Sequence, residues 1–216
     1  MTDRSHITVI LDRTGSMEPI RDDVIGGFNA FLAAQQAAPE PGTFTLVQFD
    51  SQDPYEVLQQ AVPLAEARPL TREQYVPRAG TPLYDAMGRG ILELEAALAA
   101  MPDAERPTKV IFVVVTDGAE NASREFTKAR VTRLIEAKKA LGWDVVFLSA
   151  DMDAFQDAHS MGVDPAAIVM FDKSAGSNEK LWAKTAEKVR HRRSGLAASV
   201  SYTEDERRDL RDNGGK

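Results

Sequence analysis

The feature that most restricts the fold of this chain is the run 109-KVIFVVVT-116, in which six apolar residues follow one another without interruption. A strand with one face in water alternates between apolar and polar residues, whereas a strand covered on both faces can be apolar throughout. Such strands occur almost only in α/β proteins, where helices cover both faces of a parallel sheet. The run therefore predicts the central strand of a parallel sheet.

Strand-like and helix-like segments alternate along the rest of the chain. The expected strands cover residues 7–12, 43–50, 54–62, 109–116, 143–150 and 167–171, and the expected helices cover about 20–38, 83–101, 127–141, 153–160 and 177–193. Residues 54–62 follow the preceding strand after a short turn, which indicates an antiparallel partner. The order predicts an α/β fold: a doubly wound, mostly parallel, Rossmann-like central sheet with one antiparallel edge strand and helices on both faces.

We expect one domain over residues 1–193 and a polar, flexible tail over residues 194–216. A chain of 216 residues is long for one small domain and short for two. The tail contains 203-TEDERRDLRDNGGK-216, which is nearly balanced in charge and has two glycines before its last residue. The basic cluster 190-RHRR-193 is interpreted as the charged end of the last helix, where the helix dipole favours cations.

Composition excludes several classes of function. The formal net charge of -7 argues against a general nucleic-acid binder, which needs a basic face. The chain has no cysteine, so disulfides and thiolate metal sites are excluded. No apolar signal region precedes the first strand, and the longest apolar run is far shorter than a membrane span. We therefore expect a cytoplasmic protein that binds neither membranes nor nucleic acids.

Three polar clusters follow expected strands or precede expected helices, where the function of a doubly wound sheet is usually located. They are Asp12 with Thr14 and Ser16, then Thr81 in a Gly-Thr-Pro sequence, and Asp117 in a Thr-Asp-Gly sequence. Each cluster alone is typical of helix capping or turn chemistry. Together they offer two carboxylates and three hydroxyls, an all-oxygen set that suits Mg²⁺, Mn²⁺ or Ca²⁺ and does not suit Zn²⁺. Because hydroxyls are neutral ligands, a cation held this way would attract a carboxylate from outside the chain.

These residues resemble the metal-ion-dependent adhesion site of von Willebrand factor A domains, whose pattern is Asp-x-Ser-x-Ser followed by a distant Thr and a distant Asp. Thr14 departs from the pattern but keeps the hydroxyl. The resemblance covers roughly residues 5–173 and is strongest to small stand-alone domains of bacteria and phages. It implies that Thr14, Ser16 and Thr81 contact the cation, and that Asp12 and Asp117 do so directly or through water.

The resemblance also implies a function: a binding module, not an enzyme, that captures a Glu or Asp of a protein partner through a bound Mg²⁺, with Mn²⁺ or Ca²⁺ as alternatives. An AAA+ ATPase or a larger assembly is an implied partner. A second hypothesis is a structural or assembly subunit in which the metal site is incidental.

A rival interpretation makes Asp12 a covalent nucleophile. The stretch Asp-Arg-Thr-Gly-Ser also resembles the Asp-Lys-Thr-Gly-Thr of P-type ATPases and their haloacid-dehalogenase relatives, which phosphorylate the aspartate. That family needs a Gly before the second aspartate and an Asn-Asp pair after it, whereas this chain has Thr116 before Asp117 and Glu120 with Asn121 after it. Lys109, the nearest candidate for the lysine of that family, begins a strand instead, so this alternative is disfavoured.

Two further residues are candidates for supporting the site. Asp85 lies one helical turn beyond Thr81, where it either accepts a hydrogen bond from a loop amide or metal-bound water or is a solvated first-turn acid. Asn121, with Ser123, is expected to hold the Asp117 loop through bonds from side chain to backbone. Arg78 either steers an acidic partner or is simply solvated.

Overall fold

The computed structural model describes residues 4–211. Its strands are β1 (Ser5–Asp12), β2 (Gly42–Phe49), β3 (Glu56–Pro63), β4 (Lys109–Thr116), β5 (Asp144–Ser149) and β6 (Ile168–Met170). Its α-helices are α1 (Arg21–Gln36), α2 (Leu83–Ala100), α3 (Lys128–Ala140), α4 (Met152–Ser160), α5 (Ala175–Arg193) and α6 (Glu204–Arg211). Short 3-10 helices cover Gly15–Ile20, Leu64–Glu66 and Pro165–Ala167.

The strands form one sheet in the order β3-β2-β1-β4-β5-β6. Strand β3 is antiparallel to β2, and the other neighbouring pairs are parallel. Every residue of β4 is buried, and β4 lies between β1 and β5. The predicted α/β sheet with an antiparallel edge strand is confirmed, as is the central position of the apolar run.

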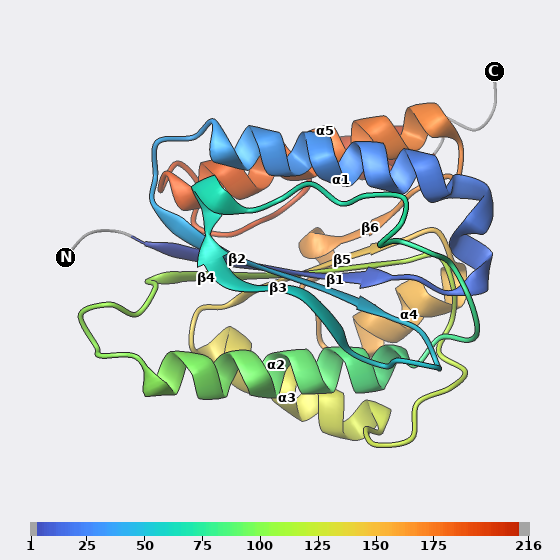
Figure 1. The fold of residues 1–216 in the computed structure, drawn as a ribbon, viewed down its shortest axis with the longest axis horizontal. Helices are drawn as coiled ribbons and strands as arrows, with labels where there is room; N and C mark the ends of the chain where they lie inside the picture. The colour runs from blue at the N-terminus through green and yellow to red at the C-terminus, as the bar shows by residue number, and fades with distance from the viewer. Residues whose placement is uncertain (1–3, 212–216) are drawn as a thin grey trace.

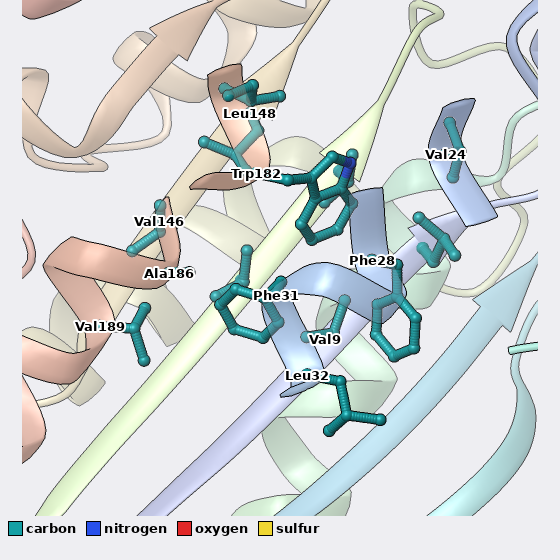
Figure 2. Close-up of a cluster of buried hydrophobic side chains, with 14 of the residues drawn as sticks. Val9, Val24, Phe28, Phe31, Leu32, Val146, Leu148, Trp182, Ala186 and Val189 are labelled. Carbon is teal, nitrogen blue, oxygen red and sulfur yellow. The ribbon is translucent and has the colours of Figure 1, made fainter. Parts of the chain in front are cut away.

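Helices cover both faces of the sheet, with α1 and α5 on one side and α2, α3 and α4 on the other (Figure 1). On the first side, Phe28 and Phe31 of α1 pack around Trp182 of α5 over Val9 and Val146 of the sheet (Figure 2). Their spacing is the helical periodicity read from the sequence. None of the helices within residues 4–211 has the length and apolar character needed to cross a membrane.

The segment after α5 differs from the expected flexible tail. Val200, Tyr202 and Leu210 are buried in the core on the α1 and α5 side. The Tyr202 amide donates to the carbonyl of Ala166, and its hydroxyl lies 2.8 Å from the Thr185 hydroxyl. The domain therefore continues to at least residue 211, because these few apolar side chains bury themselves despite their polar neighbours. The part of the expected tail beyond residue 211 lies outside the described residues.

The topology places the carboxyl ends of β1, β2, β4, β5 and β6 at one edge of the sheet, because these strands are mutually parallel. The loops that leave these ends begin at residues 13, 50, 117, 150 and 171. The polar clusters of β1 and β4 therefore meet in space although about a hundred residues separate them. The amino ends of the same strands lie at the opposite edge.

Near the amino edge, His6 of β1 is buried and is expected to make stability depend on pH. Burial lowers the pKa of its imidazole from 6.5 to about 4. Between these values the unfolded chain binds a proton that the folded chain does not, so stability falls as the pH drops through this window. We expect His6 to remove about 3 kcal/mol of stability on going from pH 7.5 to pH 4.

The measurement is urea unfolding of the wild type and of His6→Gln at both pH values. Because all other groups titrate equally in both proteins, the difference between them isolates His6. The exposed His159→Gln is the matched control and should show the wild-type pH dependence. Equal pH dependence of the wild type and His6→Gln would refute the assignment.

Candidate metal centre

The loop that follows β1 brings the first cluster together. Thr14 is extended, with φ -77° and ψ 166°, and its carbonyl accepts a hydrogen bond from the Met17 amide where the 3-10 helix begins. The Asp12 Oδ1 accepts a 2.7 Å bond from the Thr14 amide. The hydroxyls of Thr14 and Ser16 lie 3.1 Å apart. The alternating positions therefore share one side of the loop, as their spacing predicts.

The second and third clusters reach the same point. The Ser16 hydroxyl donates a 2.6 Å hydrogen bond to Oδ1 of Asp117, which follows β4. A Cβ placed on Gly118 would lie 3.4 Å from the Thr81 hydroxyl and 3.5 Å from the Ser16 hydroxyl. The glycine after Asp117 thus lies in contact distance of both hydroxyls. The structure places all three clusters around one position at the sheet edge.

Asp12 is the most enclosed member of the group. Its side chain has no solvent exposure, and its Oδ2 accepts a 2.6 Å bond from the Thr116 hydroxyl. Burial raises the pKa of Asp12 to about 7, the Asp117 carboxylate adds to the rise, and hydrogen bonds from Thr116 and Thr14 oppose it. Since both oxygens of Asp12 already accept hydrogen bonds in a buried position, the carboxylate is poorly placed to attack a phosphoryl group.

Lys173 is a residue of the site that the sequence analysis missed. Its ammonium lies 2.8 Å from Oδ2 of Asp117, whose side chain is fully buried. Lys173 follows β6, which is parallel to β5 and ends at the same edge of the sheet. The signal available in the sequence was a basic residue just after an expected strand. A cationic group therefore already lies against one of the two carboxylates of the site.

The residues fit a hard divalent cation. The donor set consists of two carboxylates and three hydroxyls, and oxygen ligands are those that Mg²⁺, Mn²⁺ and Ca²⁺ prefer. The Lys173 ammonium shows that a positive charge is accommodated beside Asp117. Within residues 4–211 no group of three or more His, Cys, Asp or Glu side chains is placed to hold a metal, so a cation here would depend on the hydroxyls.

The two supporting residues join loops to one another. The Asn121 Oδ1 accepts a 2.8 Å bond from the Thr81 amide, and the Asn121 amide donates to the Thr81 carbonyl. Asp85 accepts bonds from three consecutive amides at residues 124–126. Of the alternatives for Asp85, the structure therefore shows the bond to loop amides. Asn121 fixes the position of Thr81 relative to the Asp117 loop.

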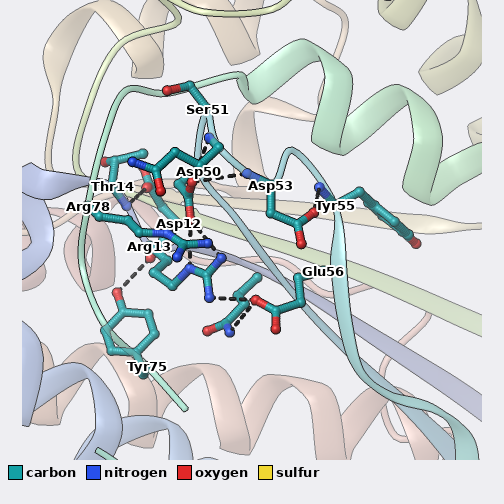
Figure 3. Close-up of polar contacts among 12 residues, drawn as sticks. Asp12, Arg13, Thr14, Asp50, Ser51, Asp53, Tyr55, Glu56, Tyr75 and Arg78 are labelled. Atoms are coloured by element: carbon teal, nitrogen blue, oxygen red, sulfur yellow. Dashed lines mark hydrogen bonds and ion pairs between the residues drawn. The ribbon is translucent and has the colours of Figure 1, made fainter. Parts of the chain in front are cut away.

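A buried ion-pair network lies beside Asp12 and was not foreseen from the sequence. Arg13, whose side chain is 5% exposed, lies 2.7 Å from Oδ2 of Asp50 and also pairs with Glu56 (Figure 3). Arg78 donates from Nε to the same Asp50 oxygen at 2.9 Å. Burial by itself would raise the pKa of Asp50, but hydrogen bonds from Arg78 and two backbone amides, with the charge of Arg13, hold it below its usual value.

This network fixes the loops that carry the candidate ligands. The Arg78 amide donates to the carbonyl of Arg13, and the Gly15 amide donates to the carbonyl of Ala79. Tyr75 donates from its hydroxyl to the backbone carbonyl of Asp12 at 2.6 Å (Figure 3). The loop after β1 is therefore bound to the segment that precedes Thr81. Arg78, which was expected either to steer a partner or to be solvated, instead pairs with Asp50.

Comparisons with known proteins come from the structure. Sequence searches find no matching protein-family model and no matching curated protein. The pilus adhesin SpaC from Lactobacillus rhamnosus GG aligns with a TM-score of 0.62 and 17% identity over 88% of this chain and 30% of the adhesin chain. A von Willebrand factor type A structure from Catenulispora acidiphila aligns with a TM-score of 0.59 and 12% identity, over 86% of this chain and 42% of that one. This chain thus spans less than half of these two matched chains.

Two other similar structures are described with metals. Manganese-loaded TRAP protein from Plasmodium vivax aligns with a TM-score of 0.53 and 13% identity, over 80% of this chain and 70% of that one. Proximal thread matrix protein 1 from the mussel byssus, described with a zinc-occupied MIDAS motif, aligns with a TM-score of 0.57 and 14% identity over 88% and 46%. Likeness at such identities establishes the fold alone. Together with the strand order and the antiparallel edge strand, it shows that this chain has the von Willebrand factor A fold.

Proposed function

We propose that this chain is a binding module that holds one divalent cation, preferably Mg²⁺, and uses it to capture an acidic residue of a protein partner. The observation that carries the proposal is the 2.6 Å bond between Ser16 and Asp117, which are 101 positions apart in the chain. It joins the clusters of β1 and β4, and Gly118 adds Thr81 to them. A purely structural role does not explain why hydroxyls and carboxylates from three segments share one position.

Each residue has a separate task in this proposal. Thr14, Ser16 and Thr81 supply neutral oxygen ligands, while Asp12 and Asp117 supply negative charge to the cation directly or through water. When bound, the cation supplies an electrophilic position that attracts a carboxylate. Buried Asp12 and Asp117 repel each other, so a cation between the segments would relieve this repulsion.

The partner that this chemistry recognises is a protein with an exposed Glu or Asp. Two of the structurally similar proteins are an adhesin and a matrix protein by description, and one is described with a metal-occupied adhesion motif. These likenesses support metal-dependent protein binding over enzymatic activity. An AAA+ ATPase or a component of a larger assembly is included in the proposal as a partner, on the sequence resemblance alone.

Metal titration of the purified protein tests the first half of the proposal. By isothermal titration calorimetry we expect Mg²⁺ and Mn²⁺ to bind with a stoichiometry of one. Ser16→Ala and Thr81→Ala each remove one oxygen ligand and should weaken binding about 10-fold or more, since losing a hydrogen-bonding or ligand group in a fixed site costs more than about 1.4 kcal/mol.

Ser160→Ala is the matched control, because Ser160 is exposed and ends α4, away from the carboxyl edge. It should bind the metals as the wild type does. Absence of metal binding by the folded wild type, or unchanged binding by both site variants, would refute the proposed site.

A second measurement tests the capture of a carboxylate. Peptides selected on the immobilised protein in Mg²⁺ should be released by EDTA. They should also lose binding when their Asp or Glu is replaced by Asn or Gln. Peptide binding that persists in EDTA would favour the structural or assembly subunit over the metal-dependent module.

A further inference from the structure

The strongest observation that the proposed function leaves unused is the ion pair between Lys173 and Asp117. The Lys173 Nζ lies 2.8 Å from Asp117 Oδ2, and the two side chains are 43% and 0% exposed. The lysine therefore reaches a buried carboxylate from the solvent side. Its ammonium occupies the outer side of the position where the three polar clusters meet.

Both oxygens of Asp117 are engaged in this arrangement. Ser16 donates to Oδ1 at 2.6 Å, and Lys173 donates to Oδ2 at 2.8 Å. A divalent cation that draws charge from Asp117 would lie within a few ångströms of the ammonium, where two positive charges repel strongly in a partly buried site. The ammonium and the metal thus require the same negative charge.

The backbone around Lys173 is fixed, whereas its side chain is not enclosed. The Asp172 amide donates to the Ser177 hydroxyl at 3.1 Å, and the Ser174 amide donates to Oδ1 of Asp172 at 2.8 Å. The Phe171 amide donates to the Ser149 carbonyl, which joins this turn to β5. A lysine stem held at its base and partly exposed along its length can swing into solvent without moving the sheet or α5.

From this geometry we infer that Lys173 is an internal cation that competes with the divalent metal for Asp117, so that metal enters the site only by displacing the lysine. The inference rests on the proposed function and adds its regulation. In the metal-free protein Lys173 neutralises Asp117 and holds the site closed to weakly bound cations. A divalent ion displaces it because it contacts several oxygen ligands at once, whereas the ammonium contacts one carboxylate.

The first test compares metal affinity in charge variants of the full chain. Lys173→Met keeps the length and apolar stem of the side chain and removes its charge, so it should bind Mg²⁺ and Mn²⁺ about five- to tenfold more tightly than the wild type in calorimetry. Lys173→Arg keeps the charge and should stay near the wild-type affinity. Lys180→Met removes an exposed lysine of α5 and serves as the control for net charge.

A second test reads the displacement without any substitution. Reductive methylation with isotope-labelled formaldehyde, followed by mass spectrometry, reports how accessible each lysine amine is. Saturating Mg²⁺ should increase the labelling rate of Lys173 severalfold and leave that of Lys180 unchanged. Unchanged or slower labelling of Lys173 in Mg²⁺ would overturn the inference.

The outcomes separate the inference from the proposed function. Equal metal affinities of the wild type and Lys173→Met would overturn the internal competitor and leave the metal site intact. Binding by Lys173→Met with none by the wild type would support the inference in its strongest form. No binding by either folded protein would overturn the proposed function and, with it, this inference.

Discussion

Replacing Gly27 by alanine should destabilise the protein by about 3 kcal/mol, at the upper end of the usual cost of overpacking a core. Gly27 lies in α1 against the indole of Trp182 in α5. A Cβ there would be 2.1 Å from Cδ1 of the indole, far inside contact distance. Trp182 is 1% exposed and packs against Phe28 and Phe31, with ring centroids at 6.0 and 5.7 Å (Figure 2). The indole has no free space into which to move, so α1 and α5 must separate.

The neighbouring Gly26 supplies the matched control. It is exposed, and nothing lies within 4 Å of a Cβ placed on it. Gly26→Ala should stabilise the protein by about 0.5 to 1 kcal/mol, because alanine favours the helix over glycine. Thermal unfolding followed by circular dichroism should show a fall of about 6 to 12 °C for Gly27→Ala. A melting temperature of Gly27→Ala at or above that of Gly26→Ala would contradict the packing of α1 on α5.

Arg193→Met should cost about 3 kcal/mol, in the range seen when one side of a buried polar network is removed. The Arg193 side chain ends α5 and is almost fully buried at the amino edge of the sheet. Its guanidinium donates to the Ser5 hydroxyl at 3.0 Å and to the backbone carbonyls of Gln35 and Glu40. Methionine fills a similar volume but donates no hydrogen bond, so the two carbonyls lose their donor.

The position of these carbonyls explains why a cation is needed there. Gln35 lies in the last turn of α1, where free carbonyls make the helix end negative. Burial lowers the pKa of the Arg193 guanidinium, but an arginine stays charged in proteins, so the cation keeps its role as a cap. The carbonyl of Arg193 in turn accepts a 2.7 Å bond from the Lys109 ammonium. Basic side chains therefore close the carboxyl ends of both α1 and α5.

Arg190→Met is the matched control in the same basic cluster. Arg190 is exposed, so its replacement should change stability by less than about 0.5 kcal/mol. Urea unfolding at constant pH, followed by fluorescence and circular dichroism together, measures both variants. Equal stabilities of Arg193→Met and Arg190→Met would show that the cluster is only a solvated helix end, as the sequence suggested.

The candidate metal site could be assembled from the sequence because topology does most of the work. Parallel strands bring their carboxyl ends to one edge, so Asp12 and Asp117 had to approach each other once β1 and β4 were recognised as neighbours in type. Thr81 was found through its loop before a helix. Metal ligation by these residues stays a prediction, whereas their convergence is a structural finding.

The residues that the sequence did not indicate share a different property. Arg13 occupies a variable position between two candidate ligands, and Lys173 is a single basic residue in a polar turn. Their roles depend on Asp50 and Asp117, which lie 37 and 56 positions away. No local periodicity records such a pairing, because one charged side chain has the same pattern in sequence whether it is solvated or buried.

The C-terminal segment failed for a related reason. Val200, Tyr202 and Leu210 are sparse among charged residues and give no helical or strand periodicity. They are buried because α5 and β6 leave apolar surface that they cover. Composition over a window averages them away, whereas packing depends on each side chain alone.

The sequence by itself determined the α/β class, the central position of β4, the antiparallel edge strand and the three segments of the candidate site. These follow from hydrophobic periodicity and strand order, which every residue of an element reports together. Only the tertiary structure decided that Arg193 caps α1, that Arg13 and Arg78 share Asp50, and that Lys173 lies on Asp117. Those contacts depend on the relative position of two distant side chains, and their energy resides in a few ångströms of separation that no one-dimensional pattern specifies.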